Sequence, residues 1–298
     1  MGSDFELVVV TDNQSSANVY LNAAILEIQR IEDLLSEFKP DSETSRINDN
    51  AGIAPINVSE EVYQIIKRAI SISSLTQGAF DISMAPLKKI YQFKNNDFNL
   101  PSENELASHL ALTGYKNIQL TQNSKVFLPV KGMALSFAAI GKGYAADQVK
   151  KRWKEMGLEN GVISAAGDLC ALGRNASGEI WKIGVANPDN TSENIAYMPV
   201  FNMAVATSGD YEQYFIFNNE RYSHTINPVN GRPCKALKSV TVVSPSAELS
   251  DALATAVYVL GIEKGLFLID QLPQTHSLIV DEFNKVHLSG NSIFEYET

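Results

Sequence analysis

The sequence predicts an α+β protein with largely antiparallel sheets and packed helices. Apolar residues recur at helical spacing in several segments of the first half, and strand-like runs fill most of the second half. Successive strands are joined by short turns, which favours antiparallel pairing. The helices are not interleaved regularly enough with strands for a doubly wound parallel sheet.

The elements expected in the first half are a strand at 7–10 and helices over about 17–38, from 59 and over about 102–114. Ser59 is a favourable N-cap residue for the second helix, and Gly78 is available after its end. The third helix opens with the capping-box pattern from Ser102 to Glu105. Each of these helices therefore has a local start signal or a continuous apolar stripe.

The elements expected in the second half are a helix over about 143–156, strands at 181–186 and 198–206, a hairpin around Asn218 and Asn219, a strand at 240–243, helices over about 247–260 and 265–272, and a terminal hairpin of 278–280 with 286–288. No internal repeat, low-complexity tract or Pro/Gly-rich linker marks a boundary. A single domain over 1–298 and two closely packed lobes both fit this length.

Composition excludes several classes of protein. The chain is 45% hydrophobic and 19% charged, as expected of a globular protein with a substantial core. Its net charge of -10 argues against a nucleic-acid partner, because phosphate binding there depends mainly on Lys and Arg. Cys170 and Cys234 are far apart, so neither a disulfide framework nor a zinc site is indicated.

No stretch approaches the roughly 18 apolar residues of a membrane-spanning helix, and no signal-peptide pattern opens the sequence. We therefore expect either a cytoplasmic protein or one whose export signal precedes Met1.

The sharpest local feature is the pair Asp251 and Thr255, which lie four residues apart and so on one face of the expected helix. A carboxylate and a hydroxyl in this arrangement can share Mg²⁺, which prefers oxygen ligands. The alternative is structural, with an Asp favoured by the helix dipole and a Thr bonded to its own helix. Spacing alone favours the structural alternative.

A small-residue turn at 138–144 opens the helix that ends near Met156. Its glycines let the backbone approach a ligand, and amides at the helix start near Gly143 could bind a pyrophosphate or stabilise developing charge. The spacing is neither a P-loop nor a dinucleotide fingerprint, and such a turn is more often only a turn.

His224 lies in the polar cluster 223–228, where a strand meets a turn, and a neutral imidazole there could take a hydroxyl proton. A histidine that caps the turn is the equal alternative. Residues 207–211 follow a strand end and could supply hydroxyls or amides to a ligand, although a plain turn is the simpler interpretation. Residues 78–81 and 167–169 are ambiguous alone, and no Ser-His-Asp pattern is visible.

Taken together and in order, these segments resemble the ApbE family of FAD:protein FMN transferases. The resemblance rests on eight segments: 1–3 (MGS), 38–48, 78–81 with Pro86-Leu87, 141–147 (GKGYAAD), 167–168, 206–211 (ATSGDY), 222–228 (YSHTINP) and 251–255. It spans nearly the whole chain, and it implies an ApbE-like fold with a ligand cleft.

The resemblance also implies roles for individual residues. Asp251 and Thr255, with the backbone carbonyl of Ala139, would bind Mg²⁺ against the FAD pyrophosphate. His224 would activate a threonine or serine of an acceptor protein. The residues implied to line the flavin nucleotide pocket are Met1, Ala79, Phe80, Asp81, Ser136, Lys142 and Ile226.

The sequence departs from the family pattern at four places. Ser136 stands where many members have an Asp that helps bind FAD, and Ile56 occupies a site that is often aromatic. Ala166 replaces the first glycine of Gly-Gly-Asp, and Asn227 replaces an Asp. We therefore expect a lower affinity for FAD, while both implied metal-binding side chains, Asp251 and Thr255, are present.

The implied reaction is Mg²⁺-dependent transfer of FMN from FAD, with release of AMP, to an acceptor bearing a Ser/Thr-Gly-Ala-Thr type of motif, expected on a membrane redox-complex subunit. An FAD pyrophosphatase of the same fold and a non-catalytic FAD-binding protein are the alternatives. The resemblance further implies a periplasmic or lipoprotein-anchored location.

Overall fold

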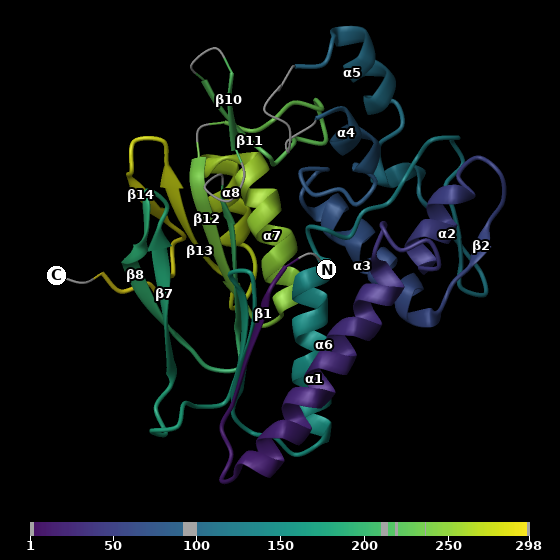
Figure 1. The fold of residues 1–298 in the computed structure, drawn as a ribbon. Coiled ribbons are helices and arrows are strands. Elements are labelled where there is room, and N and C mark those ends of the chain that lie inside the picture. The colour runs from purple at the N-terminus through teal and green to yellow at the C-terminus, as the bar shows by residue number, and fades with distance from the viewer. Residues whose placement is uncertain (1–2, 92–99, 210–213, 218–219, 236, 297–298) are drawn as a thin grey trace. The chain divides into compact units, whose positions relative to one another are not determined.

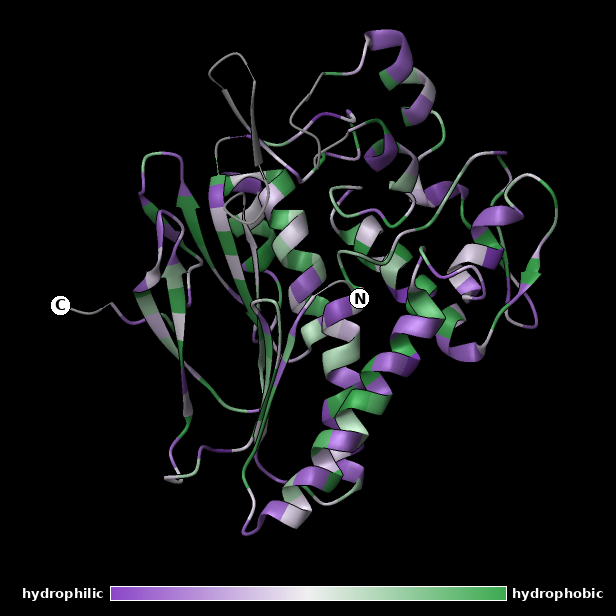
Figure 2. Cartoon of the chain, viewed as in Figure 1, coloured by the Kyte–Doolittle hydropathy of each residue, from purple (hydrophilic) through white to green (hydrophobic). Residues whose placement is uncertain are grey.

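The computed structural model describes residues 3–91, 100–209, 214–217, 220–235 and 237–296. The chain divides into two compact units, each made of separate segments. Unit 1 comprises Met1–Ile31, Ile140–Tyr211 and Ala236–Thr298, and unit 2 comprises Glu32–Ala139 and Glu212–Lys235. The first helix, α1 (Gln14–Leu35), runs from one unit into the other, with hydrophilic and hydrophobic residues alternating along it (Figure 2).

Unit 1 is built on a seven-stranded antiparallel sheet. In spatial order its strands are β1 (Phe5–Val9), β5 (Gly161–Ala165), β6 (Asp168–Leu172), β9 (Ala204–Gly209), β12 (Leu237–Ser244), β13 (His276–Asp281) and β14 (Val286–Leu288). Neighbouring residues along a strand pack on opposite faces, as Val162 and Ile163 do, because side chains alternate across a strand. Both faces of this sheet are consequently covered.

One face carries the helices α6 (Gly141–Glu155), α7 (Ala247–Leu260) and α8 (Ile262–Ile269) (Figure 1). Trp153 in the last turn of α6 is fully buried and belongs to the same apolar cluster as Ile163 and Leu172 of the sheet. The other face carries the hairpin of β7 (Trp181–Asn187) and β8 (Asn190–Val200), whose Met198 and Val200 pack on the sheet. Unit 1 therefore has three layers, with α6 and α7 side by side on the sheet.

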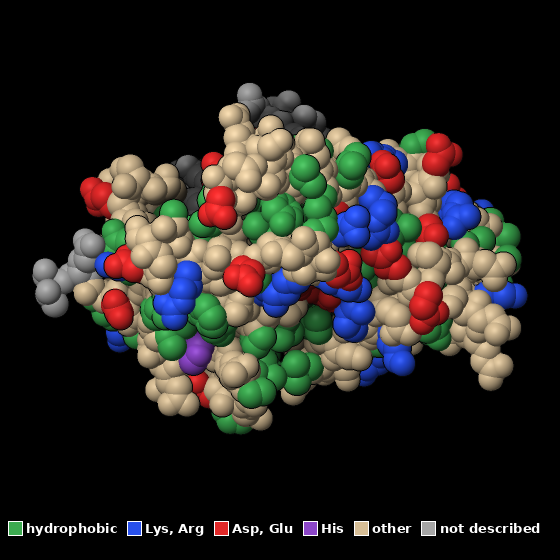
Figure 3. Space-filling view, turned by 90° about the horizontal axis from the view of Figure 1, so that it is seen from below, with side chains coloured by type: hydrophobic (Ala, Val, Ile, Leu, Met, Phe, Trp, Pro, Cys, Tyr) green, Lys and Arg blue, Asp and Glu red, His purple; other side chains and the backbone are tan. Residues whose placement is uncertain are grey.

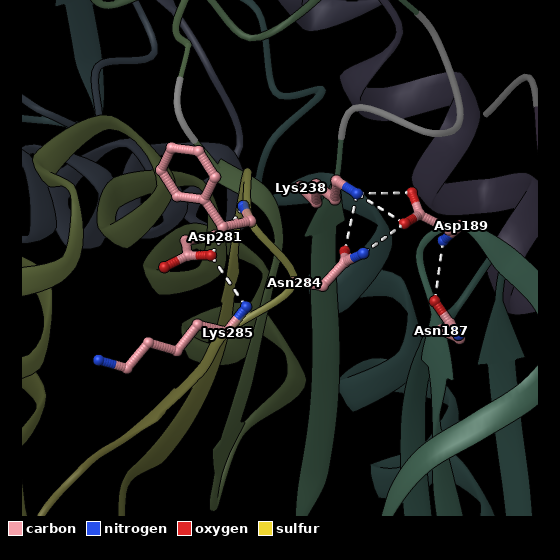
Figure 4. Close-up of polar contacts among 7 residues, drawn as sticks. Asn187, Asp189, Lys238, Asp281, Asn284 and Lys285 are labelled. Carbon is pink, nitrogen blue, oxygen red and sulfur yellow. Dashed lines mark hydrogen bonds and ion pairs between the residues drawn. The ribbon is translucent and has the colours of Figure 1, made fainter.

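Polar side chains join two turns and one strand of unit 1 (Figure 4). The Lys238 ammonium contacts both carboxylate oxygens of Asp189, at 2.8 and 2.6 Å, and the Asn284 Oδ1 at 2.7 Å. The Asn284 amide also donates to Asp189 at 2.8 Å. These contacts connect the β7–β8 turn, β12 and the β13–β14 turn.

Unit 2 combines short helices with small sheets. Its elements are α2 (Glu43–Asp49), α3 (Glu60–Leu75), α4 (Ala85–Ile90), α5 (Glu103–Leu110), the 3₁₀ turn η1 (Tyr115–Asn117), a sheet in the order β2 (Ile56–Asn57), β4 (Lys125–Phe127), β3 (Gln119–Thr121), and the hairpin of β10 (Tyr214–Phe217) with β11 (Glu220–Ser223). All the paired strands of its sheet and hairpin are antiparallel.

The expected α+β class with antiparallel sheets is confirmed, and so are the local start signals. The Ser59 and Ser102 hydroxyls accept from the amides three residues on, each at 3.3 Å. Helix α7 has the expected bounds. The strands on either side of 218–219 pair as the expected hairpin, while those two residues lie outside the described part of the chain.

The continuous strand expected over 198–206 is wrong. The chain leaves β8 at Val200 and enters β9 at Ala204, and between them Asn202 has φ of 57°. Its side-chain oxygen accepts from the Gly173 N–H at 3.0 Å. Asn tolerates this left-handed backbone better than most residues, so the turn interrupts an apolar run that otherwise reads as one strand.

In the part of the chain that the structure describes, no helix combines the length and the apolar character needed to cross a membrane. On the face shown in Figure 3, acidic and basic side chains are interspersed and apolar side chains form small groups between them.

Candidate functional site

Asp251 and Thr255 lie one turn apart on α7 in unit 1. The Asp251 side chain is buried, and its Oδ2 accepts from the Gly143 N–H at 3.1 Å. The Thr255 hydroxyl is 3.4 Å from the Ser208 hydroxyl of β9. Two contacts from neighbouring elements therefore orient the two side chains that the sequence singles out.

The side-chain atoms that these contacts bring together are oxygen atoms. The hydroxyls of Thr207 and Thr241, 2.9 Å apart, lie on the opposite face of the sheet and do not belong to this set. Among the described residues, no group of three or more His, Cys, Asp or Glu side chains could hold a metal. A carboxylate with neutral hydroxyls nonetheless fits Mg²⁺, because this ion is bound through one or two carboxylates and completes its shell with water or phosphate oxygens.

Lys142, in the first turn of α6, forms an ion pair with Asp168 at 2.6 Å. Asp168 opens β6 directly after the two-residue turn of Ala166 and Gly167, whose φ values are 49° and 94°. Burial raises the pKa of Asp168, while the Lys142 ammonium and the Thr207 N–H act in the opposite direction. A carboxylate thus anchors the ammonium at the start of α6.

The interpretation of the Gly143 amide as an anion-binding group is wrong. Helix α6 begins at Gly141, and the Gly143 N–H is donated to the Asp251 carboxylate. A Cβ at Gly143 would lie 2.1 Å from the carbonyl oxygen of Ala247 on α7. The glycine is therefore needed for the close approach of two helices, and its amide binds a protein carboxylate.

In unit 2, Asp81 makes three hydrogen bonds within its own unit. Its Oδ1 accepts from the Ser83 N–H and hydroxyl, both at 2.7 Å, and its Oδ2 accepts from the Tyr115 N–H at 2.8 Å. Burial raises the pKa of Asp81, and the bonds from Ser83 and Tyr115 oppose that shift. The preceding side chains, Ala79 and Phe80, are 3% and 1% exposed. Their role in a nucleotide pocket stays a prediction.

Ser136 is buried, and its hydroxyl donates to Glu37 Oε1 at 2.6 Å. Its N–H donates to the carbonyl of Ile82 at 2.8 Å, which ties this segment to the residues after Asp81. A carboxylate therefore stands beside Ser136 even though the residue itself is not an Asp. Ala139, three residues on, ends the first segment of unit 2.

His224 lies in a chain reversal of unit 2 and is partly exposed. Backbone bonds from Ser223 to Cys234 (3.3 Å) and from Cys234 to Thr225 (2.8 Å) close the reversal around it. Ile226 is buried against Met84. Segments around Met84 and His224, far apart in the sequence, are thus brought together.

The candidate residues fall into two sets. Unit 1 holds Lys142, Asp251 and Thr255, and unit 2 holds Ala79, Phe80, Asp81, Ser136, Ala139, His224 and Ile226. Met1 lies outside the described residues. Sequence reasoning missed Asp168 as the partner of Lys142 and Glu37 as the partner of Ser136. The Gly167-Asp168 pair was an ambiguous sequence signal for Asp168. No sequence pattern marked Glu37, which is 99 residues from Ser136.

Comparison with known proteins places the chain in a family. A model of the ApbE family matches residues 1–279. The FAD:protein FMN transferase of Haemophilus influenzae is 28% identical over 99% of this chain and 88% of its own length. One from Klebsiella pneumoniae is 32% identical over 88% of this chain and 82% of its own length.

Solved structures of ApbE proteins are also similar to this chain. The ApbE protein of Thermotoga maritima is 30% identical, with 99% of both chains covered and a TM-score of 0.88. The flavin transferase ApbE of Vibrio cholerae is 26% identical, covers 97% of this chain and 94% of its own, and has a TM-score of 0.87. The chain belongs to the ApbE family.

Proposed function

We propose that this chain is an FAD:protein FMN transferase, as its relatives are named, and that it works with Mg²⁺ on a Thr or Ser hydroxyl of an acceptor protein. The observation that carries the proposal is the oxygen cluster of Asp251, Thr255 and Ser208 in unit 1. A buried carboxylate beside hydroxyls suits a hard cation bound to a diphosphate.

Asp251 and Thr255 would hold the Mg²⁺, which when bound neutralises negative charge on the FAD pyrophosphate. Lys142 adds a fixed positive charge for a phosphate oxygen. Its ion pair with Asp168 keeps the ammonium at the start of α6, where the helix dipole also favours an anion. These residues therefore bind and orient the diphosphate.

His224 is the proposed base. Its imidazole takes the proton of the acceptor hydroxyl as the oxygen forms a bond to the FMN phosphorus. The bond from that phosphorus to the bridging oxygen breaks, and AMP leaves with the bond electrons on that oxygen. The product is an acceptor with FMN attached through a phosphoester.

We also propose that Glu37 contributes to FAD binding. Its carboxylate accepts the Ser136 hydroxyl at 2.6 Å and stands at the position where the sequence pattern led us to expect a lost carboxylate. We expect Glu37→Gln to weaken FAD binding several-fold, measured by flavin fluorescence. Asp41→Asn, which changes an exposed carboxylate, serves as the control. Equal FAD affinity in the two variants would show that Glu37 does not contribute to FAD binding.

The test of the function uses the chain with FAD, Mg²⁺ and an acceptor bearing a Ser/Thr-Gly-Ala-Thr type of motif. We expect a fluorescent acceptor that is heavier by one FMN in a mass spectrum, and no label on an acceptor whose target hydroxyl residue is replaced by Val. Free FMN and AMP with an unlabelled acceptor would establish the pyrophosphatase instead. Bound but unchanged FAD would contradict both enzymes and leave a flavin-binding protein.

We also propose an extracytoplasmic place of work, periplasmic or lipoprotein-anchored, with a membrane redox-complex subunit as the acceptor. Fractionation of cells that express the protein with its native flanking sequence tests the location.

A further inference from the structure

Asp147, the last residue of the GKGYAAD segment, holds the start of α7 although it lies on α6. Its Oδ1 accepts from the Ala247 N–H at 3.0 Å, and its Oδ2 accepts from the Glu248 N–H at 2.9 Å and from the Ser246 hydroxyl at 2.7 Å. The first amides of a helix have no partner within the helix, so the neighbouring helix satisfies them here.

The arrangement is reciprocal. Asp251 of α7 accepts from the Gly143 N–H in the first turn of α6, just as Asp147 of α6 accepts from the first turn of α7. Between these two contacts the helix backbones nearly touch, because any Cβ on Gly143 would meet the Ala247 carbonyl. Two carboxylates and one glycine therefore set the spacing and register of the two helices.

This register decides where the proposed metal ligands stand. Asp251 is one turn beyond the amides that Asp147 holds, and Thr255 is one turn further. A shift of the first turn of α7 would move Asp251 away from Gly143 and Thr255 away from Ser208. We propose that Asp147 is a positioning residue for the Mg²⁺ site, an inference that rests on the proposed function.

The test measures metal binding without turnover. Mn²⁺ is titrated into the protein, and the free ion is followed by electron paramagnetic resonance. We expect Asp147→Ala to weaken Mn²⁺ binding about 10–100-fold, the range for groups that orient metal ligands. Asp147→Asn should have a smaller effect, because the amide keeps one oxygen acceptor while its NH₂ faces a backbone donor. The Mg²⁺ concentration for half-maximal FMN transfer should rise in the same order.

The control is Leu278→Ala, which removes a fully buried side chain of β13 on the opposite face of the sheet. It should lower the melting temperature without changing Mn²⁺ affinity. If Asp147→Ala and Asp147→Asn also lower only the melting temperature, Asp147 is a structural cap and the inference is overturned. If Asp147→Ala does not fold, Asp147→Asn decides alone.

The inference and the proposed function can fail separately. Wild-type protein that binds Mn²⁺ but labels no acceptor contradicts the transferase, while the Mn²⁺ affinities of the Asp147 variants still decide the positioning role. Wild-type protein that binds no Mn²⁺ overturns the positioning role together with the metal site.

Discussion

The two units hold their candidate residues in different ways. In unit 1, Asp251 and Thr255 stand on a helix and are oriented by Gly143 and Ser208 on neighbouring elements. In unit 2, Asp81 lies in a turn, and its carboxylate accepts hydrogen bonds from backbone and hydroxyl groups of that unit. A polar pair on a rigid helix is placed for a ligand, whereas a carboxylate in a turn first serves to hold the turn.

We expect the largest effect when the carboxylate of Asp251 is removed. We expect Asp251→Ala to lower the rate of FMN transfer by at least about 100-fold, since even groups that only orient a metal ligand are worth roughly 10–100-fold. Asp251→Asn separates two roles, because its side-chain oxygen can still accept the Gly143 N–H but carries no charge. The exposed Glu263→Ala on α8 is the control. Full transfer by Asp251→Asn would mean that Asp251 only caps α6.

The contact between α6 and α7 is tested next. We expect Gly143→Ala to destabilise the protein by about 2–3 kcal/mol in urea unfolding, because the new methyl group meets backbone that cannot move aside. Gly290→Ala is the matched control, since the nearest atom to its added Cβ, Asp270 Oδ1, lies at an ordinary contact distance of 3.5 Å. That variant should lose less than about 1 kcal/mol. Equal losses would contradict the requirement for a glycine at the helix crossing.

The contribution of the Asp81 carboxylate to the stability of the protein should depend on pH. We expect Asp81→Asn to cost about 1–3 kcal/mol of stability, because the amide keeps only one acceptor oxygen and its NH₂ group then faces either the Ser83 or the Tyr115 donor. Burial raises the folded-state pKa of Asp81 above its ordinary value of 3.8, with the Ser83 and Tyr115 bonds opposing this. The stabilisation from a raised pKa is complete below the unfolded value and is lost as the pH rises through the folded one.

The stability of wild-type protein relative to Asp81→Asn should therefore fall as the pH rises from about 4 towards neutrality. Urea unfolding of both proteins over this range measures it. A difference that stays constant or grows with pH would contradict the raised pKa.

The smallest expected effect lies in the turn before Asp168. Ala166 has φ of 49°, a conformation that costs an L-residue about 1–2 kcal/mol. Ala166→Gly should raise stability by about 0.5–1 kcal/mol after the greater entropy of the unfolded glycine is included. Gly167→Ala should lower it, and only through the backbone, because no atom lies within 4 Å of the added Cβ. Thermal melts of both variants check the opposite signs.

Local patterns in the sequence predicted the elements well where periodicity and caps agree. The bounds of α7 and the caps at Ser59 and Ser102 follow from residues within a few positions of one another. The strand expected over 198–206 failed because one Asn turned the chain, and apolar periodicity does not register such a turn.

The candidate site was predictable only in part. The spacing of Asp251 and Thr255 placed them on one face of a helix, since helical periodicity is local. The partner of the Gly143 amide was not predictable, because Asp251 is 108 residues away. The same holds for Ser136 and Glu37, which no pattern in the sequence connects.

The α+β class, most of the helices and strands, and the ordered motifs that correspond to the ApbE family follow from the order of residues along the chain. Which polar groups form hydrogen bonds within the protein is seen only in the folded chain. Gly143 gives its amide to Asp251, Asp147 holds the first turn of α7, and Asp81 closes a turn. Secondary structure depends on neighbours along the chain, whereas the use of a carboxylate depends on which donors folding brings within about 3 Å of it.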